Sequence, residues 1–168
     1  MDMGLQMIKQ LPTKEFLNEI FEYCDGNLYQ KQQRGASKQG AKVGWIEKNG
    51  YVATDVNNIR YRVHRLIYQY HFGFCPEFID HIDCDKTNNK IENLRPATVF
   101  ENNRNRKVTL QNKSGLKGAF WDKQRKKWKA SIKINNKSIH LGHFENSLDA
   151  HLAYKKESLK IHGEFANY

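Results

Sequence analysis

The sequence predicts an α+β chain in which an irregular first module precedes a three-stranded antiparallel sheet packed on one helix. Apolar residues recur with helical period at residues 13–23 and 63–72, among short strand-like runs separated by Asn- and Gly-rich turns. Residues 127–134 instead alternate between apolar and polar side chains, as in a strand with one buried face. A polar, basic stretch at residues 107–113 shows neither period and predicts a linker.

We therefore expect one domain at 1–106 and a second at 114–168. Within the first, Thr13 can cap the N-terminal helix, and Asn-Gly at 49–50 and Asn-Asn at 57–58 each predict the turn of a hairpin. The helix at 63–72 should follow.

Beyond that helix, residues 85–89 predict a turn and residues 91–95 the beginning of a returning strand. Thr98 can cap a short final helix.

The second domain should contain strands at 116–121, 127–134 and 138–144, with a turn at 135–136. Ser147 is expected to cap a helix that runs to about residue 162. The apolar side of the central strand should pack on this helix, where Ala150 and Ala153 allow close approach. That side is formed by Trp128, Ala130, Ile132 and Ile134.

Charge is distributed unevenly along a chain whose formal net charge is +10. Residues 31–75 carry a net charge of +6 and residues 104–140 of +11, whereas residues 76–103 carry −3. Such a basic chain favours a polyanionic partner, most often nucleic acid. An acidic island between basic segments suits a metal site in a DNA enzyme, because carboxylates hold the cation while the flanks attract phosphate.

No apolar run approaches a membrane span and no signal-peptide core is recognisable, so neither a membrane protein nor a secreted one is expected. Cys24, Cys75 and Cys84 are widely spaced and predict reduced thiols in an intracellular protein.

The acidic island contains an adjacent acid–imidazole pair, Asp80 and His81, which would point to opposite faces of an extended strand. A neutral imidazole can take a proton from an attacking water during phosphodiester hydrolysis. The Asp80 carboxylate and the Asn102 carbonyl are hard oxygen donors that suit Mg²⁺ or Mn²⁺ better than zinc.

Several motifs in this region, over roughly residues 20–106, resemble the HNH homing endonucleases of phages and group I introns. They are V-H-R-L-I-Y-Q-Y-H-F (63–72), D-H-I-D-C-D-K-T-N-N (80–89), E-N-L-R (92–95) and E-N-N-R-N-R (101–106). The resemblance implies a ββα-metal (His-Me finger) nuclease module.

The same resemblance implies a role for individual residues. His81 would be the general base, and Asp80 and Asn102 would hold one Mg²⁺ or Mn²⁺ ion per active site. Asn93 would tie the loop and orient His81. Asn103, adjacent to Asn102, could take its place as ligand. His64, in an apolar helix, is expected to pack or to satisfy backbone groups, and Asn88 and Asn89 to form the turn.

The polar side of residues 127–134 is cationic and should be free to contact phosphate or enter the major groove. Arg125, in the preceding turn, is the best candidate for a guanine contact. The full set of expected DNA-binding residues is Arg104, Arg106, Lys117, Phe120, Trp121, Lys123, Arg125, Lys127, Lys129 and Lys133.

Residues 114–166 resemble the Apetala-type, ethylene-response-factor-like DNA-binding domain. The motifs are S-G-L-K-G-A-F-W (114–121), W-K-A-S-I (128–132), H-L-G-H-F (140–144), A-x-x-A-Y (150–154) and H-G-E-F-A (162–166). The resemblance implies a sheet inserted into the major groove of DNA. A generic basic domain that binds RNA or protein is the alternative.

Together these features predict a metal-dependent, homing-type endonuclease that cuts double-stranded DNA at a specific site, as a monomer or homodimer without a small-molecule cofactor. It would act in the cytoplasm of a bacterial host, encoded by a phage or mobile element. The alternatives are a transcription regulator that retains an inactive nuclease module and a packaging protein that uses only its basic surface.

Overall fold

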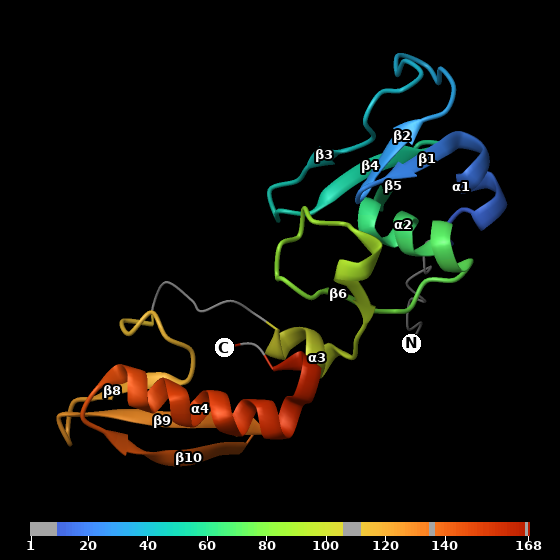
Figure 1. Cartoon of the computed structure of the whole chain (residues 1–168). Helices are drawn as coiled ribbons and strands as arrows, with labels where there is room; N and C mark the ends of the chain where they lie inside the picture. The colour runs from blue at the N-terminus through green and yellow to red at the C-terminus, as the bar shows by residue number, and fades with distance from the viewer. Residues whose placement is uncertain (1–9, 106–111, 135–136, 167) are drawn as a thin grey trace, which may run out of the picture. The chain divides into compact units, whose positions relative to one another are not determined.

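The computed structural model describes residues 10–105, 112–134, 137–166 and 168, and the chain divides into two compact units, Met1–Ala97 and Thr98–Tyr168 (Figure 1). Each unit contains helices and strands, which confirms the α+β class. The division precedes the linker expected at 107–113, most of which lies outside the described residues. The short helix α3 (Val99–Arg104) contacts the C-terminal turn η2 (Gly163–Phe165) and therefore groups with the second unit.

The first unit begins with helix α1 (Lys14–Ile20), which Thr13 caps by accepting a hydrogen bond from the Phe16 amide. The prediction that this helix reaches residue 23 is wrong. Residues 21–24 form strand β1 (Phe21–Cys24), which pairs with β2 (Asn27–Gln30). Pairing with β2 supplies the backbone hydrogen bonds that the helix would otherwise have provided.

Strands β3 (Trp45–Ile46), β4 (Val52–Val56) and β5 (Ile59–Arg62) form an antiparallel sheet in that order. Both predicted hairpins are confirmed, and Asn57 and Asn58 adopt the left-handed conformation that a tight turn needs.

Helix α2 (Val63–Phe72) spans the residues that the sequence predicts. It supplies Leu66 and Ile67 to the core of the first unit, where they meet Leu17 of α1 and Leu28 of β2. All four side chains are fully buried. Packing in this core therefore fixes α2 against α1 and β2.

Strand β6 (Ile79–His81) pairs with β7 (Leu94–Pro96) to form a separate two-stranded sheet. The returning strand expected at residues 91–95 begins instead with a 3₁₀ turn, η1 (Ile91–Asn93). The Ile91 amide in this turn donates to the Tyr23 hydroxyl, and this hydrogen bond ties the segment between β6 and β7 to β1.

In the second unit, Thr98 and Glu101 form a capping box at α3, as the sequence leads one to expect of Thr98. Strands β8 (Ala119–Asp122), β9 (Lys127–Ile134) and β10 (Lys137–Phe144) form an antiparallel sheet in the order β10-β9-β8. Strand β8 begins three residues later than position 116. The turn expected at 135–136 lies outside the described residues.

Helix α4 (Ser147–His162) lies along this sheet (Figure 1). Its cap is Asn146 rather than Ser147, since the Asn146 side chain accepts from the Asp149 amide. Ala119, Ala130 and Ala150 are fully buried where helix and sheet meet. Small side chains therefore let the two elements approach closely, as predicted for Ala150. No helix in the described part of the chain has the length and hydropathy to span a membrane.

Replacement of Gly26 should destabilise the first unit. Gly26 has φ +80°, and a Cβ there would lie 2.7 Å from the Lys90 amide nitrogen. Gly26→Ala should cost about 2–3 kcal/mol of unfolding free energy, from backbone strain plus the forced shift of the loop. Gly40→Ala is the matched control, because Gly40 has φ +76° with nothing within 4 Å and should show the strain alone. Equal thermal midpoints for the two variants would contradict the close contact.

Candidate active site

The two residues of the acid–imidazole pair lie on β6, and both side chains are buried. Arg95, opposite Asp80 on β7, donates from Nε at 3.0 Å and from Nη2 at 2.8 Å to the Asp80 Oδ2 atom. The guanidinium compensates a carboxylate that is only 4% exposed, so the anion is tolerated away from water.

The imidazole of His81 is held from one side by Asn89. Its Nε2 atom lies 3.0 Å from the Asn89 Oδ1 atom, and both residues are buried. Because a carbonyl oxygen only accepts, this contact needs a proton on Nε2, and the neutral ring then has its lone pair on Nδ1. The sequence leads us to read Asn89 as a turn residue only, and its contact with His81 is what that interpretation missed.

Asn93 closes the loop that joins β6 to η1. Its Nδ2 group donates to the Asp83 Oδ1 atom at 2.9 Å and to the Asn88 carbonyl at 2.7 Å, while its Oδ1 accepts from the Asp83 amide. Its backbone carbonyl accepts from the Ile82 amide, next to His81. One side chain thereby links both ends of the loop.

Asp83 is the second fixed point of this loop. Its carboxylate accepts from the Asp85 amide at 2.8 Å and from the Asn88 side chain at 2.6 Å, besides Asn93. Partial burial acts to raise the Asp83 pKa, but these hydrogen bonds and the nearby His81 together outweigh it, so the pKa is lowered. The charged form of Asp83 therefore holds the loop.

Two further rings surround His81. The His64 ring meets it edge-on with centroids 5.0 Å apart, and the Tyr51 ring lies 6.0 Å away. Burial lowers the pKa of His64 well below its ordinary value, and the charges of Arg62 and other neighbours act in the same direction. His64 therefore packs as a neutral ring. Within the described residues, its buried Nδ1 has no hydrogen-bond partner.

The remaining predicted nuclease residues belong to the second unit. Asn102 lies on α3 and is half-buried. Asn103 and Arg104 occupy the end of the same helix, and Arg106 lies outside the described residues. The convergence of Asn102 with Asp80 and His81, and with it the ββα-metal arrangement, stays a prediction.

The predicted DNA-binding residues of the second unit divide between the two sides of the sheet. Phe120 is paired with Lys129, which places both on the side facing away from α4, together with Lys127 and Lys133. Trp121 lies on the other side, where its ring meets Trp128 edge-on with centroids 5.3 Å apart. The open side also carries Asp122, which is paired with Lys127. We call the set Phe120, Lys127, Lys129, Ser131 and Lys133 on this side the cationic sheet face.

The turn from β8 to β9 contains Lys123 and Arg125, and the Arg125 guanidinium lies 3.9 Å from the Asp122 carboxylate. The carbonyl of Lys117, just before β8, faces the His151 ring at hydrogen-bond distance.

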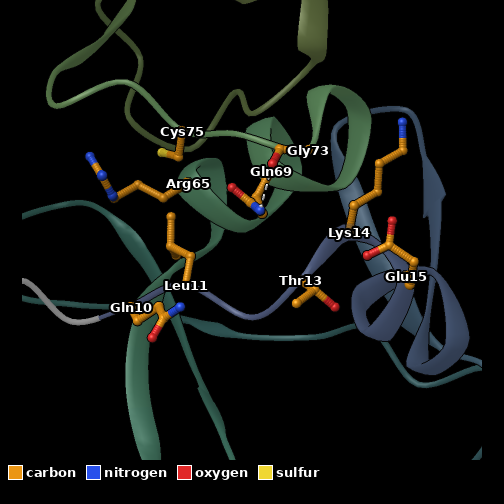
Figure 2. A pocket seen from close by; sticks show the side chains of 9 residues that line it. All are labelled: Gln10, Leu11, Thr13, Lys14, Glu15, Arg65, Gln69, Gly73 and Cys75. Atoms are coloured by element: carbon orange, nitrogen blue, oxygen red, sulfur yellow. Dashed lines mark hydrogen bonds between the residues drawn. The ribbon is translucent and has the colours of Figure 1, made fainter.

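A cavity of about 450 Å³ lies apart from these residues. It is bordered by α1 and α2, with Lys14, Arg65, Gln69 and Cys75 among its lining side chains (Figure 2). None of the predicted catalytic residues lines it. Within the described residues, no group of three or more His, Cys, Asp and Glu side chains could hold a metal ion. The oxygen donors of Asp80 and Asn102 nonetheless match the ligands that Mg²⁺ and Mn²⁺ prefer.

Comparison with known proteins assigns this region. Residues 61–104 match a family described as HNH endonuclease. The chain therefore contains an HNH endonuclease domain. The matched segment contains Asp80, His81, Asn93 and Asn102, and nucleases of this family typically use a divalent metal.

Two curated relatives of this chain come from viruses. Protein 3.8 of Escherichia phage T7 is 34% identical over 91 residues, which is 54% of this chain and 74% of the relative. An uncharacterized HNH endonuclease, L560, of Acanthamoeba polyphaga mimivirus is 32% identical over 131 residues, covering 75% of this chain and 66% of the relative. No solved structure matches.

The charge of Asp83 should contribute pH-dependent stability. Because its pKa is lower in the folded chain, the contribution is present above the ordinary carboxyl pKa and is lost as the pH falls through the lowered value. Asp83→Asn should reduce the unfolding free energy by about 1 kcal/mol at pH 7. The difference from the wild type should shrink below about pH 4.

Urea denaturation of both proteins between pH 3 and pH 7 measures this difference. A gap that stays constant over the whole range would show that the Asp83 charge does not hold the loop.

Proposed function

We propose that this HNH endonuclease is a divalent-metal-dependent enzyme of the homing type, which cuts double-stranded DNA at a specific site. The observation that carries the proposal is the environment of His81: a buried imidazole whose Nε2 lies 3.0 Å from the Asn89 side-chain oxygen, directly after the buried Asp80 on the same strand. An imidazole held in one tautomer suits the activation of water at a phosphodiester.

In the proposed reaction His81 accepts a proton from water at Nδ1, while Asn89 keeps the other ring nitrogen protonated. Arg95 orients the Asp80 side chain through its two hydrogen bonds to Oδ2. A Mg²⁺ or Mn²⁺ ion held by Asp80 and Asn102 would neutralise charge on the phosphate and on the leaving oxygen. Asn93 positions His81 through the loop that it closes. Hydrolysis in this family's manner would leave a 5′ phosphate and a 3′ hydroxyl.

We propose that the second unit increases the affinity for DNA and fixes the position of the enzyme along the duplex. Its cationic sheet face presents Lys127, Lys129 and Lys133 on one side of β9, where they can follow a phosphate backbone. An Apetala-type insertion of this sheet into the major groove would agree with such a face. Arg104, Arg106, Lys117, Lys123 and Arg125 complete the proposed contacts, whereas Trp121 lies on the side of the sheet that faces α4.

Loss of the imidazole should abolish cleavage. With supercoiled plasmid and Mg²⁺, His81→Ala should lower the cleavage rate by at least about 100-fold, since a positioned general base contributes about 10²–10⁴-fold. Asp80→Ala should be equally inactive but still bind DNA in a gel-shift assay. His71→Ala is the control, because its ring packs on Tyr23 and Tyr70 in the same unit.

The wild type should cut with Mg²⁺ and not with EDTA. If the wild type binds the plasmid without cutting it under either condition, the chain acts as a DNA-binding regulator instead. Unchanged cleavage by His81→Ala would remove the imidazole from the chemistry.

Neutralising the open sheet face should flatten the salt dependence of DNA binding. The double variant Lys129→Gln, Lys133→Gln should reduce the slope of log K against log salt by about 1.8, because each phosphate that is no longer neutralised lowers the slope by about 0.9. Lys156→Gln with Lys160→Gln on α4 removes the same charge from another surface and should leave the slope unchanged. Equal slopes for the two double variants would contradict a backbone contact at this face.

A further inference from the structure

The β3–β5 sheet of the first unit has an open side on which aromatic and cationic side chains alternate. Tyr51 lies two residues before Ala53, so both belong to the same side of the sheet. Ala53 is paired with Trp45 on β3 and with Arg62 on β5, which places these two residues on that side as well. Arg60 lies two residues before Arg62 on β5 and shares its side. We call Trp45, Tyr51, Arg60 and Arg62 the aromatic–cation face.

Each arginine of this face is stacked on a ring. The Arg60 guanidinium lies 5.1 Å from the Trp45 ring centroid, and that of Arg62 lies 4.2 Å from the Tyr51 centroid. Lys86, from the loop after β6, adds a third cation, with its Nζ atom 4.6 Å from the Tyr51 centroid. Stacking restricts these long side chains and holds their charged groups in place.

Lys86 also links two distant segments. Its Nζ group donates to the Asn49 carbonyl at 2.9 Å, in the turn between β3 and β4. The loop after β6 is thereby fastened to the β3–β5 sheet, and the two cations on Tyr51 come from elements 24 residues apart in sequence.

The three cations differ in how their charge is compensated. Arg60 forms ion pairs with Asp55 at 3.2 Å and with Glu47 at 4.0 Å. Neither Arg62 nor Lys86 forms an ion pair with a carboxylate in the described part of the chain. An exposed, uncompensated and immobilised pair of cations suits an anionic ligand with several oxygens.

This pair lies close to the catalytic imidazole. The Tyr51 ring that supports both cations is 5.3 Å from His64 and 6.0 Å from His81, measured between ring centroids. An anion bound by Arg62 and Lys86 would therefore lie within about one nucleotide of the bond attacked by the water that His81 activates, since neighbouring phosphates of a strand are spaced on this scale.

We propose that Arg62 and Lys86, supported by Tyr51, bind a backbone phosphate of the DNA strand next to the one that is cut. The first unit then has a DNA contact of its own, which positions the strand at His81 independently of the second unit. This inference rests on the proposed endonuclease function. Arg62 and Lys86 are positioning residues, because they hold the strand rather than the reacting atoms.

The test measures binding of the full chain to a labelled, random-sequence DNA duplex in EDTA over a range of salt concentrations. Arg62→Gln and Lys86→Gln should each reduce the slope of log K against log salt by about half of the 0.9 expected for one phosphate, because the two cations neutralise that phosphate together. Arg60→Gln is the matched control: it removes the same charge from the same strand and face, but a compensated one, and should change the slope by less than about 0.3. Arg62→Lys should retain the wild-type slope.

Cleavage of supercoiled plasmid with Mg²⁺ provides the second measurement. The double variant Arg62→Gln, Lys86→Gln should cut at least about tenfold more slowly at saturating enzyme, because the strand is bound but misplaced. Tyr51→Leu keeps the charges of Arg62 and Lys86 but removes the ring on which both stack. It should therefore slow cleavage while it leaves the salt slope nearly unchanged.

Slopes for Arg62→Gln and Lys86→Gln that match the slope for Arg60→Gln would overturn the phosphate contact. If the wild type binds the duplex but does not cut it with Mg²⁺, the proposed function fails, and the salt slopes in EDTA still decide whether the contact exists. Thermal unfolding of each variant shows that the exposed substitutions leave the fold intact.

Discussion

The closure of the loop between β6 and η1 by Asn93 is the constraint on which the rest of the site depends. Asn93 binds Asp83 at one end of this loop and Asn88 at the other, and Asp83 in turn binds the Asn88 side chain. These hydrogen bonds hold the loop that contains Asn89 and Lys86. Asn89 sets the tautomer of His81, and Lys86 reaches the turn between β3 and β4. One buried amide therefore orders both the His81 imidazole and the Lys86 side chain.

The ion pair beneath this loop has a different energetic character. Burying Asp80 and Arg95 removes both from water, at a cost that their mutual attraction only partly offsets. Such a pair adds little stability compared with apolar residues, but loss of one partner would leave a buried charge, at a cost of about 3–5 kcal/mol. In the proposed mechanism the pair serves to hold the Asp80 carboxylate at a fixed position on the strand that also contains His81.

Local signals in the sequence were sufficient where one turn or one face decides the structure. The Asn-Gly and Asn-Asn turns, the span of α2 and the alternation along β9 follow from backbone preferences and burial of one side. The N-terminal helix ends early because β1 pairs with β2, a competition between elements that helical periodicity does not register. The cap of α4 at Asn146 differs from the prediction by one residue, since two neighbouring side chains could serve equally.

The candidate site divides in the same way. Asp80, His81 and Asn93 can be selected from the sequence by their types and intervals, and their roles in the chemistry stay predictions. Asn89 cannot be selected in this way, because an Asn in a polar loop is an ordinary turn former until the fold buries it against His81. The stacking of Arg62 and Lys86 on Tyr51 joins three segments that no local pattern connects.

Net charge alone overstates how much of this surface can hold DNA. Lys127 lies 2.6 Å from Glu145 and Arg60 is paired with Asp55, so these cations release fewer counterions when a phosphate approaches. Arg62, Lys86 and the outer lysines of β9 are the positions where a phosphate would meet uncompensated charge. Binding strength should therefore follow the number of such positions on each unit, which makes the placement of carboxylates as important to DNA recognition as the placement of the lysines and arginines themselves.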